Sequence, residues 1–166
     1  MSERDETVSA DERVRRQLRD ELMHSHAHVG FERAFAGLPA AHRNARVEGQ
    51  PHSIWKLLEH LRLAQWDILE FSRGAGHVSP KWPEGYWPEG EVADDAAWEA
   101  SLAACRADVA RFCELVDDPS RDLHAPFEWG DGQTLMREAL VIIDHNAYHV
   151  GQVVTLRQLL GSWPPA

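Results

Sequence analysis

The last long segment of the chain, Thr134 to Leu160, restricts most strongly how the protein can fold. Apolar residues recur there at three- and four-residue steps, and they occupy more than half of the circumference of a helix. A helix this apolar has to be covered by other helices or by a partner subunit. The segment therefore predicts a long buried or interface helix, which opens at Thr134 or Gln133 and ends before Gly161.

Three earlier segments show the same periodicity. The expected helices run from Ser9 to Ala36, from His52 or Ser53 to Ser72, and from Asp94 or Asp95 to Val116. A polar start at residues 1–8 precedes them, and nothing in the chain marks a domain boundary. Four helices without a strong strand signal predict an all-α four-helix bundle, with residues 1–166 forming a single domain.

The connections between these helices are long. Residues 37–51 lack any period and are expected to be a loop at the rim of a site, while 74–92 are rich in Gly, Pro and Trp. We expect the aromatic residues of 74–92 to pack over the bundle, with Trp82 and Trp87 either packing or lining a pocket. In 117–132, the tripeptide at 127–129 is expected to be a short extended stretch that ends in a turn.

Composition excludes several classes of function. With 166 residues and a formal net charge of −10, the chain lacks the basic surface that nucleic acids or anionic membranes require. No apolar run is long enough to span a membrane, and the first residues do not resemble a signal peptide. Cys105 and Cys113 lie too far apart on one helix for a disulfide. Two unbridged thiols suit the cytoplasm, where we expect the protein.

His145 and His149 lie four residues apart inside the last apolar segment. On a helix they are offset by about 40° and about 6 Å, so both imidazoles share one face and one metal ion could bind both. The best candidate for a third ligand is His60, which lies inside the second helix at the edge of its apolar face. Ala64, one turn later, leaves space beside that ring. The three histidines predict a metal site with open positions for water or substrate.

Other interpretations of the histidines stay open. A single histidine on an apolar helix face is usually a core residue with a hydrogen-bond partner, and for the pair His145 and His149 packing and metal binding are both considered. His24 and His28 repeat the four-residue spacing, but they share a polar segment with His26. A solvated cluster at the rim is the favoured interpretation there.

Four further polar residues flank the predicted site. Glu138 is in line with the histidines but two turns away, where a salt bridge or water contact is expected. Asp67 is either an acceptor for an imidazole N–H or a surface carboxylate. Tyr148 and Gln152 border the histidine face, and we expect one of them to contact a ligand histidine.

Two sequence motifs resemble a known family. Segment 145–152, HNAYHVGQ, followed by Leu156, Arg157 and an ending with Gly161 and Pro164, closely resembles the last helix of the DinB-like (damage-inducible, YfiT-like) superfamily. Segment 53–61, SIWKLLEHL, resembles the histidine motif of its second helix. The order and spacing of the helices match across nearly the whole chain.

The resemblance implies an up-down-down-up four-helix bundle, usually a homodimer. It implies a divalent metal, nickel or zinc, on the residues matching His60, His145 and His149. Characterised relatives include low-molecular-weight-thiol S-transferases and a mycothiol-dependent isomerase. The expected function is a metal-dependent S-transferase or hydrolase that activates a thiol or water against a small-molecule substrate. The alternative is a non-catalytic stress-response protein that binds a metal or a small ligand. A haem bundle is a third hypothesis, disfavoured because the three histidines cluster.

Overall fold

The computed structural model describes residues 8–91 and 94–164, and in these ranges the chain is helical and contains no strand. The elements are α1 Ala10–Met23, α2 Phe31–Phe35, α3 Ala40–Arg43, α4 Ile54–Arg73, the 3₁₀ turn η1 Glu84–Tyr86, α5 Asp95–Asp117 and α6 Leu135–Leu159. The polar start expected at the N-terminus lies outside the described residues, apart from Val8. No helix of the described chain is both long and apolar enough to cross a bilayer.

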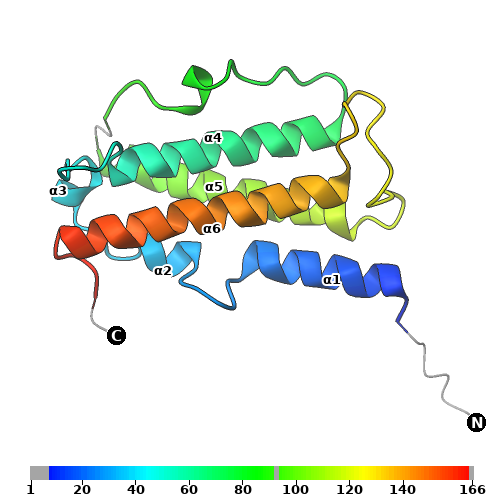
Figure 1. Cartoon of the computed structure of the whole chain (residues 1–166), viewed down its shortest axis with the longest axis horizontal. Helices are drawn as coiled ribbons and strands as arrows, with labels where there is room; N and C mark the ends of the chain where they lie inside the picture. The colour runs from blue at the N-terminus through cyan, green and yellow to red at the C-terminus, as the bar shows by residue number, and fades with distance from the viewer. Residues whose placement is uncertain (1–7, 92–93, 165–166) are drawn as a thin grey trace, which may run out of the picture.

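The four long helices α1, α4, α5 and α6 form an up-down-down-up bundle, as expected. Helices α4 and α5 run in the same direction, and α1 and α6 run against them (Figure 1). Because α4 and α5 are parallel, the chain between them has to return along the length of the bundle. We call the described part of this connection, residues 74–91, the strap. It lies along the outside of α4 (Figure 1).

Side-chain caps set the starts of the long helices where the sequence predicted them. The caps are Ser9, Ser53, Asp94 and Thr134, and each side chain accepts a hydrogen bond from the backbone N–H three residues later. Helix α6 ends before Gly161, whose φ of 67° places it in the left-handed region that favours glycine.

The prediction of one helix from Ser9 to Ala36 is wrong in its middle. The helix ends at Met23, and helical structure resumes only at Phe31. Residues 24–28 are all exposed and include no apolar side chain larger than alanine, so further helical turns would bury nothing in return for ordering the backbone. Gly30, a poor helix former, then serves as the N-cap of α2.

Two loop predictions also need correction. The predicted loop at 37–51 contains one helical turn, α3. Residues 127–129 form a turn and not an extended stretch: the N–H of Gly130 donates to the carbonyl of Phe127 at 3.1 Å. The N–H of Phe127 in turn donates to the Gln133 carbonyl at 2.8 Å, which folds the chain back toward the start of α6.

The core consists of two apolar clusters, one at each end of the bundle. The first combines α2, the starts of α4 and α5 and the end of α6, around residues such as Phe35, Leu58 and Val153. The second combines α1, the ends of α4 and α5 and the start of α6, around residues such as Phe112 and Ile142. The middle turns of α4 and α6 between these clusters carry polar side chains, and we call this region the polar layer.

The outer side of α6 is not covered within one chain. Leu140, Tyr148 and Leu159 are 53%, 64% and 59% exposed, respectively. Homodimer formation stays a prediction, and these residues would be the ones to pack against a second copy. Cys105 and Cys113 are buried and unbridged, as expected.

Candidate metal centre

The polar layer brings His60 of α4 together with His145 and His149 of α6, as the sequence predicted. One ring nitrogen from each histidine lies within 4.8 Å of the other two. The Nε2 atoms of His145 and His60 are 3.0 Å apart, and the three pairs of ring centroids are separated by 4.5–4.9 Å. Within the described chain, this is the one cluster of histidine, cysteine or carboxylate groups with spacing suited to a metal ion.

Hydrogen bonds fix the orientation of two of the rings. His60 Nδ1–H donates to the carbonyl oxygen of Tyr86 at 2.8 Å, and His149 Nδ1–H donates to Oε1 of Gln152 at 2.7 Å. Both acceptors are oxygens, so Nδ1 carries the hydrogen in each ring and Nε2 keeps its lone pair. Such outer contacts hold the tautomer that metal coordination requires.

The strap holds His60 from outside the bundle. Trp87 stacks on His60 with ring centroids 4.0 Å apart, and its indole also stacks on His52 at 3.9 Å. Further along the strap, the carbonyl of Gly90 accepts a hydrogen bond from Nε1 of Trp55 at 3.2 Å. The position of His60 therefore depends on a connection that contributes little to the two apolar clusters.

Burial keeps the three imidazoles neutral. It lowers the pKa of His60, of His149 and, most strongly, of His145, whose pKa falls to about 3 because of burial and the neighbouring His149 and His60. Neutral imidazole is the form that binds a metal ion. Two imidazole nitrogens on a tetrahedral zinc ion are about 3.3 Å apart. The observed 3.0 Å between Nε2 of His145 and Nε2 of His60 is close to that spacing, so the residues fit a divalent ion.

A pocket of about 440 Å³ opens beside two of these histidines. His60, His145, Glu138, Asp67 and Tyr86 are among the residues that line it. Asp67 accepts hydrogen bonds from the hydroxyl of Tyr86 at 2.6 Å and from a ring nitrogen of His77 at 2.7 Å. A pocket with convergent polar groups at a histidine cluster is the usual form of a small-molecule site.

Glu138 is buried in the wall of this pocket, where it pairs with the exposed guanidinium of Arg137. Burial raises the pKa of the Glu138 carboxyl, and the nearby Asp67 adds to the effect, while Arg137 opposes it. The salt bridge expected for Glu138 is confirmed. A carboxyl group with a raised pKa can take up and return a proton nearer to neutral pH than a surface carboxylate can.

Predictions for the flanking residues meet with different outcomes. Gln152 contacts His149, one of the three clustered histidines, as expected, and the ring centroid of Tyr148 also lies 4.9 Å from that of His149. Asp67 does contact an imidazole, but that imidazole belongs to His77 of the strap. The prediction that Asp67 supports one of the three clustered histidines is therefore wrong. Trp82 lines the pocket and Trp87 packs on His60, in accordance with the two roles considered for them.

Sequence reasoning missed His77 and Tyr86 altogether. Both lie in the strap, where no helical period relates them to the histidines, and their common partner in α4, Asp67, is 10 and 19 residues away from them, respectively. The motif W-P-E-G-Y-W gave the only signal, an unusual density of aromatic residues beside glycine and proline. His24, His26 and His28 are all exposed, which confirms the rim interpretation of that cluster.

The fold and the site together define an all-α bundle that presents three clustered histidines from two neighbouring helices, with a pocket beside them. Proteins of this class hold metals and small ligands between facing helices of the bundle. A sequence model of the DinB superfamily matches residues 25–153, and the chain belongs to that superfamily. The matched range includes all three histidines. No curated protein and no solved structure matches the chain.

Proposed function

We propose that the protein binds a divalent metal ion, nickel or zinc, through His60, His145 and His149, and that it is a metal-dependent enzyme. The reaction would be of the S-transferase or hydrolase type, with a low-molecular-weight thiol or water as the nucleophile. A bound divalent ion would supply Lewis acidity, which lowers the pKa of a thiol or water enough to give a nucleophile near neutral pH.

The observation that carries this proposal is the pocket beside the histidines. Structural metal sites are closed by a fourth protein ligand, whereas catalytic sites keep a position open for water or substrate. Here the cluster found among the described residues has three members, and His60 and His145 both line a pocket of about 440 Å³. That volume is ample for a small-molecule substrate.

The residues around the histidine cluster and its pocket have separable roles in such a reaction. Tyr86 and Gln152 orient the ligand histidines through the hydrogen bonds to their Nδ1 atoms. Glu138 lies in the pocket wall with a raised pKa and would accept the proton that the nucleophile loses. Arg137 lines the same pocket and would stabilise an anionic group on the substrate.

The test is elemental analysis of the natively purified protein, together with two activity assays. We expect about one equivalent of nickel or zinc per chain, and almost none in His145→Gln. His124→Gln, the same exchange at an exposed histidine, is the matched control and keeps its metal. The assays combine glutathione or cysteine with an activated aryl chloride, and water with an activated aryl ester.

Removal of the metal with a chelator should abolish the activity, and one equivalent of the ion should restore it. Glu138→Gln should keep the metal but lose activity by about a hundredfold, because it lacks the proton acceptor. Unchanged metal content in His145→Gln would refute the site. Stoichiometric metal without either activity would instead favour the non-catalytic binding protein.

A further inference from the structure

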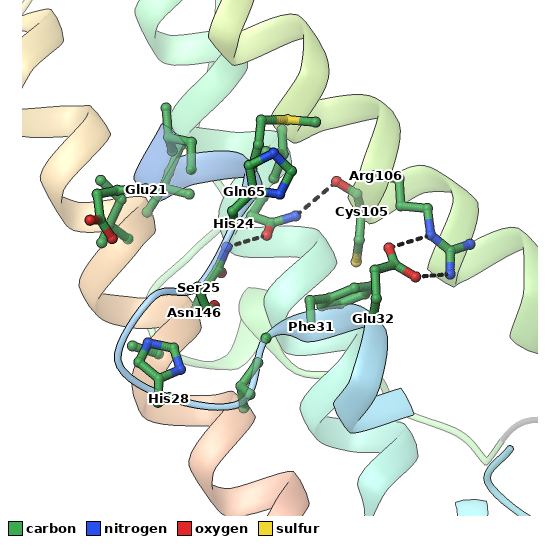
Figure 2. Close-up of a pocket in the computed structure, with 18 of the residues that line it drawn as sticks. Glu21, His24, Ser25, His28, Phe31, Glu32, Gln65, Cys105, Arg106 and Asn146 are labelled. Carbon is green, nitrogen blue, oxygen red and sulfur yellow. Dashed lines mark hydrogen bonds and ion pairs between the residues drawn. The ribbon is translucent and has the colours of Figure 1, made fainter. Parts of the chain in front are cut away.

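The two cavities beside α6 offer different surfaces to a ligand. One lies at the break between α1 and α2 and has a volume of about 360 Å³ (Figure 2). A chain of amides lies at its base: Nδ2 of Asn146 donates to Oε1 of Gln65 at 2.7 Å, and Nε2 of Gln65 donates to the carbonyl of Cys105 at 3.2 Å (Figure 2). Among the described residues, Phe31 supplies the one phenyl ring of its lining, and that ring already packs on Phe35 with centroids 4.7 Å apart.

The pocket beside the histidines is richer in aromatic surface. Phe71 of α4 and Trp82 and Tyr86 of the strap all line it, and so do the aliphatic side chains of Ala64, Ile68 and Val141. At about 1.5 Å per residue, the face of α4 from His60 to Phe71 is about 16 Å long. A molecule that reaches the histidines from outside therefore lies against an apolar wall for part of its length.

Trp82 is the most open of these aromatic residues. It is 72% exposed, although it lines the pocket. Within the described chain its one ring contact is an edge contact with Tyr86, at a centroid distance of 5.4 Å and an angle of 60°. The faces of the indole are left to solvent at the mouth of the pocket. A second aromatic ring that covered one face would bury apolar surface and gain the stacking attraction as well.

The turn that carries this indole is held in one shape. The N–H of Gly85 donates to the carbonyl of Lys81 at 2.7 Å. A Cβ atom at Gly85 would lie only 2.8 Å from Cβ of Pro80, so the turn closes as tightly as it does because the residue is glycine. The hydroxyl of Tyr86 donates to Asp67 of α4 at 2.6 Å and fastens the end of the turn to the bundle. An exposed ring on a fixed turn is preorganised, which lowers the ordering cost of binding.

We propose that the substrate of this pocket carries an aromatic ring, which stacks on the exposed indole of Trp82 while the reacting group reaches His60 and His145. The place of the reacting group rests on the function proposed above, whereas stacking on Trp82 does not require a metal. Net charge alone does not define the substrate, because charged side chains of both signs line the pocket: Asp67, Glu138 and Arg137.

Two thiols that differ only in their ring test the stacking, 4-phenylbutane-1-thiol and 4-cyclohexylbutane-1-thiol. The chain and the thiol are the same in both, and only the phenyl ring can stack on an indole. Anaerobic calorimetric titration of the full-length protein, with zinc supplied and after metal removal, gives the ratio of the two dissociation constants. Trp82→Leu should change this ratio about fivefold against the phenyl compound, because one aromatic pair is lost while leucine still contacts the cyclohexyl ring.

Trp66→Leu is the matched control, because Trp66 is a partly exposed tryptophan of α4 that does not line the pocket. It should leave the ratio unchanged. An unchanged ratio in Trp82→Leu, an equal change in Trp66→Leu, or no binding of either thiol would each overturn the proposal.

The metal-free titration separates this proposal from the function on which it builds. Removing the metal should weaken the binding of both thiols and leave the effect of Trp82→Leu on the ratio in place. If metal removal weakens neither thiol and Trp82→Leu still changes the ratio, the metal-dependent function fails and the aromatic site stands.

Discussion

The two flanks of α6 carry different polar chemistry on adjacent residues. His145 faces His60 and the strap side, while Asn146, turned by about 100°, faces Gln65 and the break between α1 and α2. Both side chains lie in the polar layer, between the same two apolar clusters. On one flank three imidazoles converge, and on the other an amide chain runs from helix to helix.

The two flanks differ in whether their polar groups can titrate. An imidazole gains or loses a proton, and its ring nitrogens change between donor and acceptor, so the histidine flank responds to pH and to cations. An amide has fixed donors and acceptors and no titration in this range. The amide flank therefore links α6, α4 and α5 through hydrogen bonds that do not change with pH, and Oδ1 of Asn146 is its one buried acceptor without a partner in the described chain. The adjacent residues His145 and Asn146 thus belong to two different regions of α6, one that responds to pH and one that does not.

The largest expected difference between the flanks is in the pH dependence of the free energy of unfolding, which the histidine flank should cause and the amide flank should not. In the metal-stripped protein the pKa of His145 is about 3, and those of His60 and His149 are lowered too. The unfolded chain, with histidine near 6.5, binds more protons than the folded chain below that pH. The free energy of unfolding should therefore fall on acidification, by about 2.3 kcal/mol between pH 6.5 and 4.5 from His145 alone, and the lowered pKa values of His60 and His149 add to this loss.

Urea unfolding at several pH values measures this slope. His145→Gln should flatten it, and Gln65→Met should leave it unchanged. The carboxyls of Asp108 and Glu138 have raised pKa values and act with the opposite sign, since the folded chain binds their protons first; their effect belongs to the acidic end of the range. An equal slope in His145→Gln and the parent protein would contradict the assignment.

A smaller effect is expected when each flank loses one polar side chain. Gln65→Met removes both amide hydrogen bonds and leaves the amide of Asn146 buried without an acceptor, so it should cost about 2 kcal/mol at pH 7.5. His145→Met in metal-stripped protein should cost under about 1 kcal/mol, because His60 keeps its bond to Tyr86. Urea midpoints compare the two, and a larger loss in His145→Met would reverse the comparison.

The smallest effect concerns the strap. Trp87→Leu removes two ring stacks, on His60 and His52, and should lower stability by about 1 kcal/mol and metal affinity by up to about tenfold. Trp82→Leu changes an exposed tryptophan of the same strap and is the control, with little effect on either quantity. Thermal unfolding and a metal-competition titration provide the two measurements. Equal losses in both variants would mean that the stacking on His60 is not responsible.

The sequence was sufficient wherever a local rule decides the outcome. Apolar periodicity and cap residues such as Ser53 and Thr134 placed α4, α5, α6 and the start of α1 to within a few residues. The helical angles of His145 and His149 placed both rings on one face, and the apolar edge position of His60 was enough to pair it with them.

The sequence was insufficient where burial is decided by distant parts of the chain. Three- and four-residue steps continue through His26 and Val29, so the period alone could not show that α1 ends at Met23. Gln65 gave no signal either, since nothing local distinguishes a buried glutamine from an exposed one. Its partner Asn146 is 81 residues away, and the cavity that both line forms only because the predicted first helix is broken.

The strap has a consequence for how such a protein can change over evolutionary time. It supplies the carbonyl of Tyr86 and the ring of Trp87 to His60, yet it contributes little to the apolar clusters on which the bundle depends. Substitutions in a surface connection are tolerated more readily than those in packed helices. Sequence changes in residues 74–91 can therefore reshape the pocket beside the histidines while the four helices stay intact, so that the shape of the pocket can change on a constant scaffold.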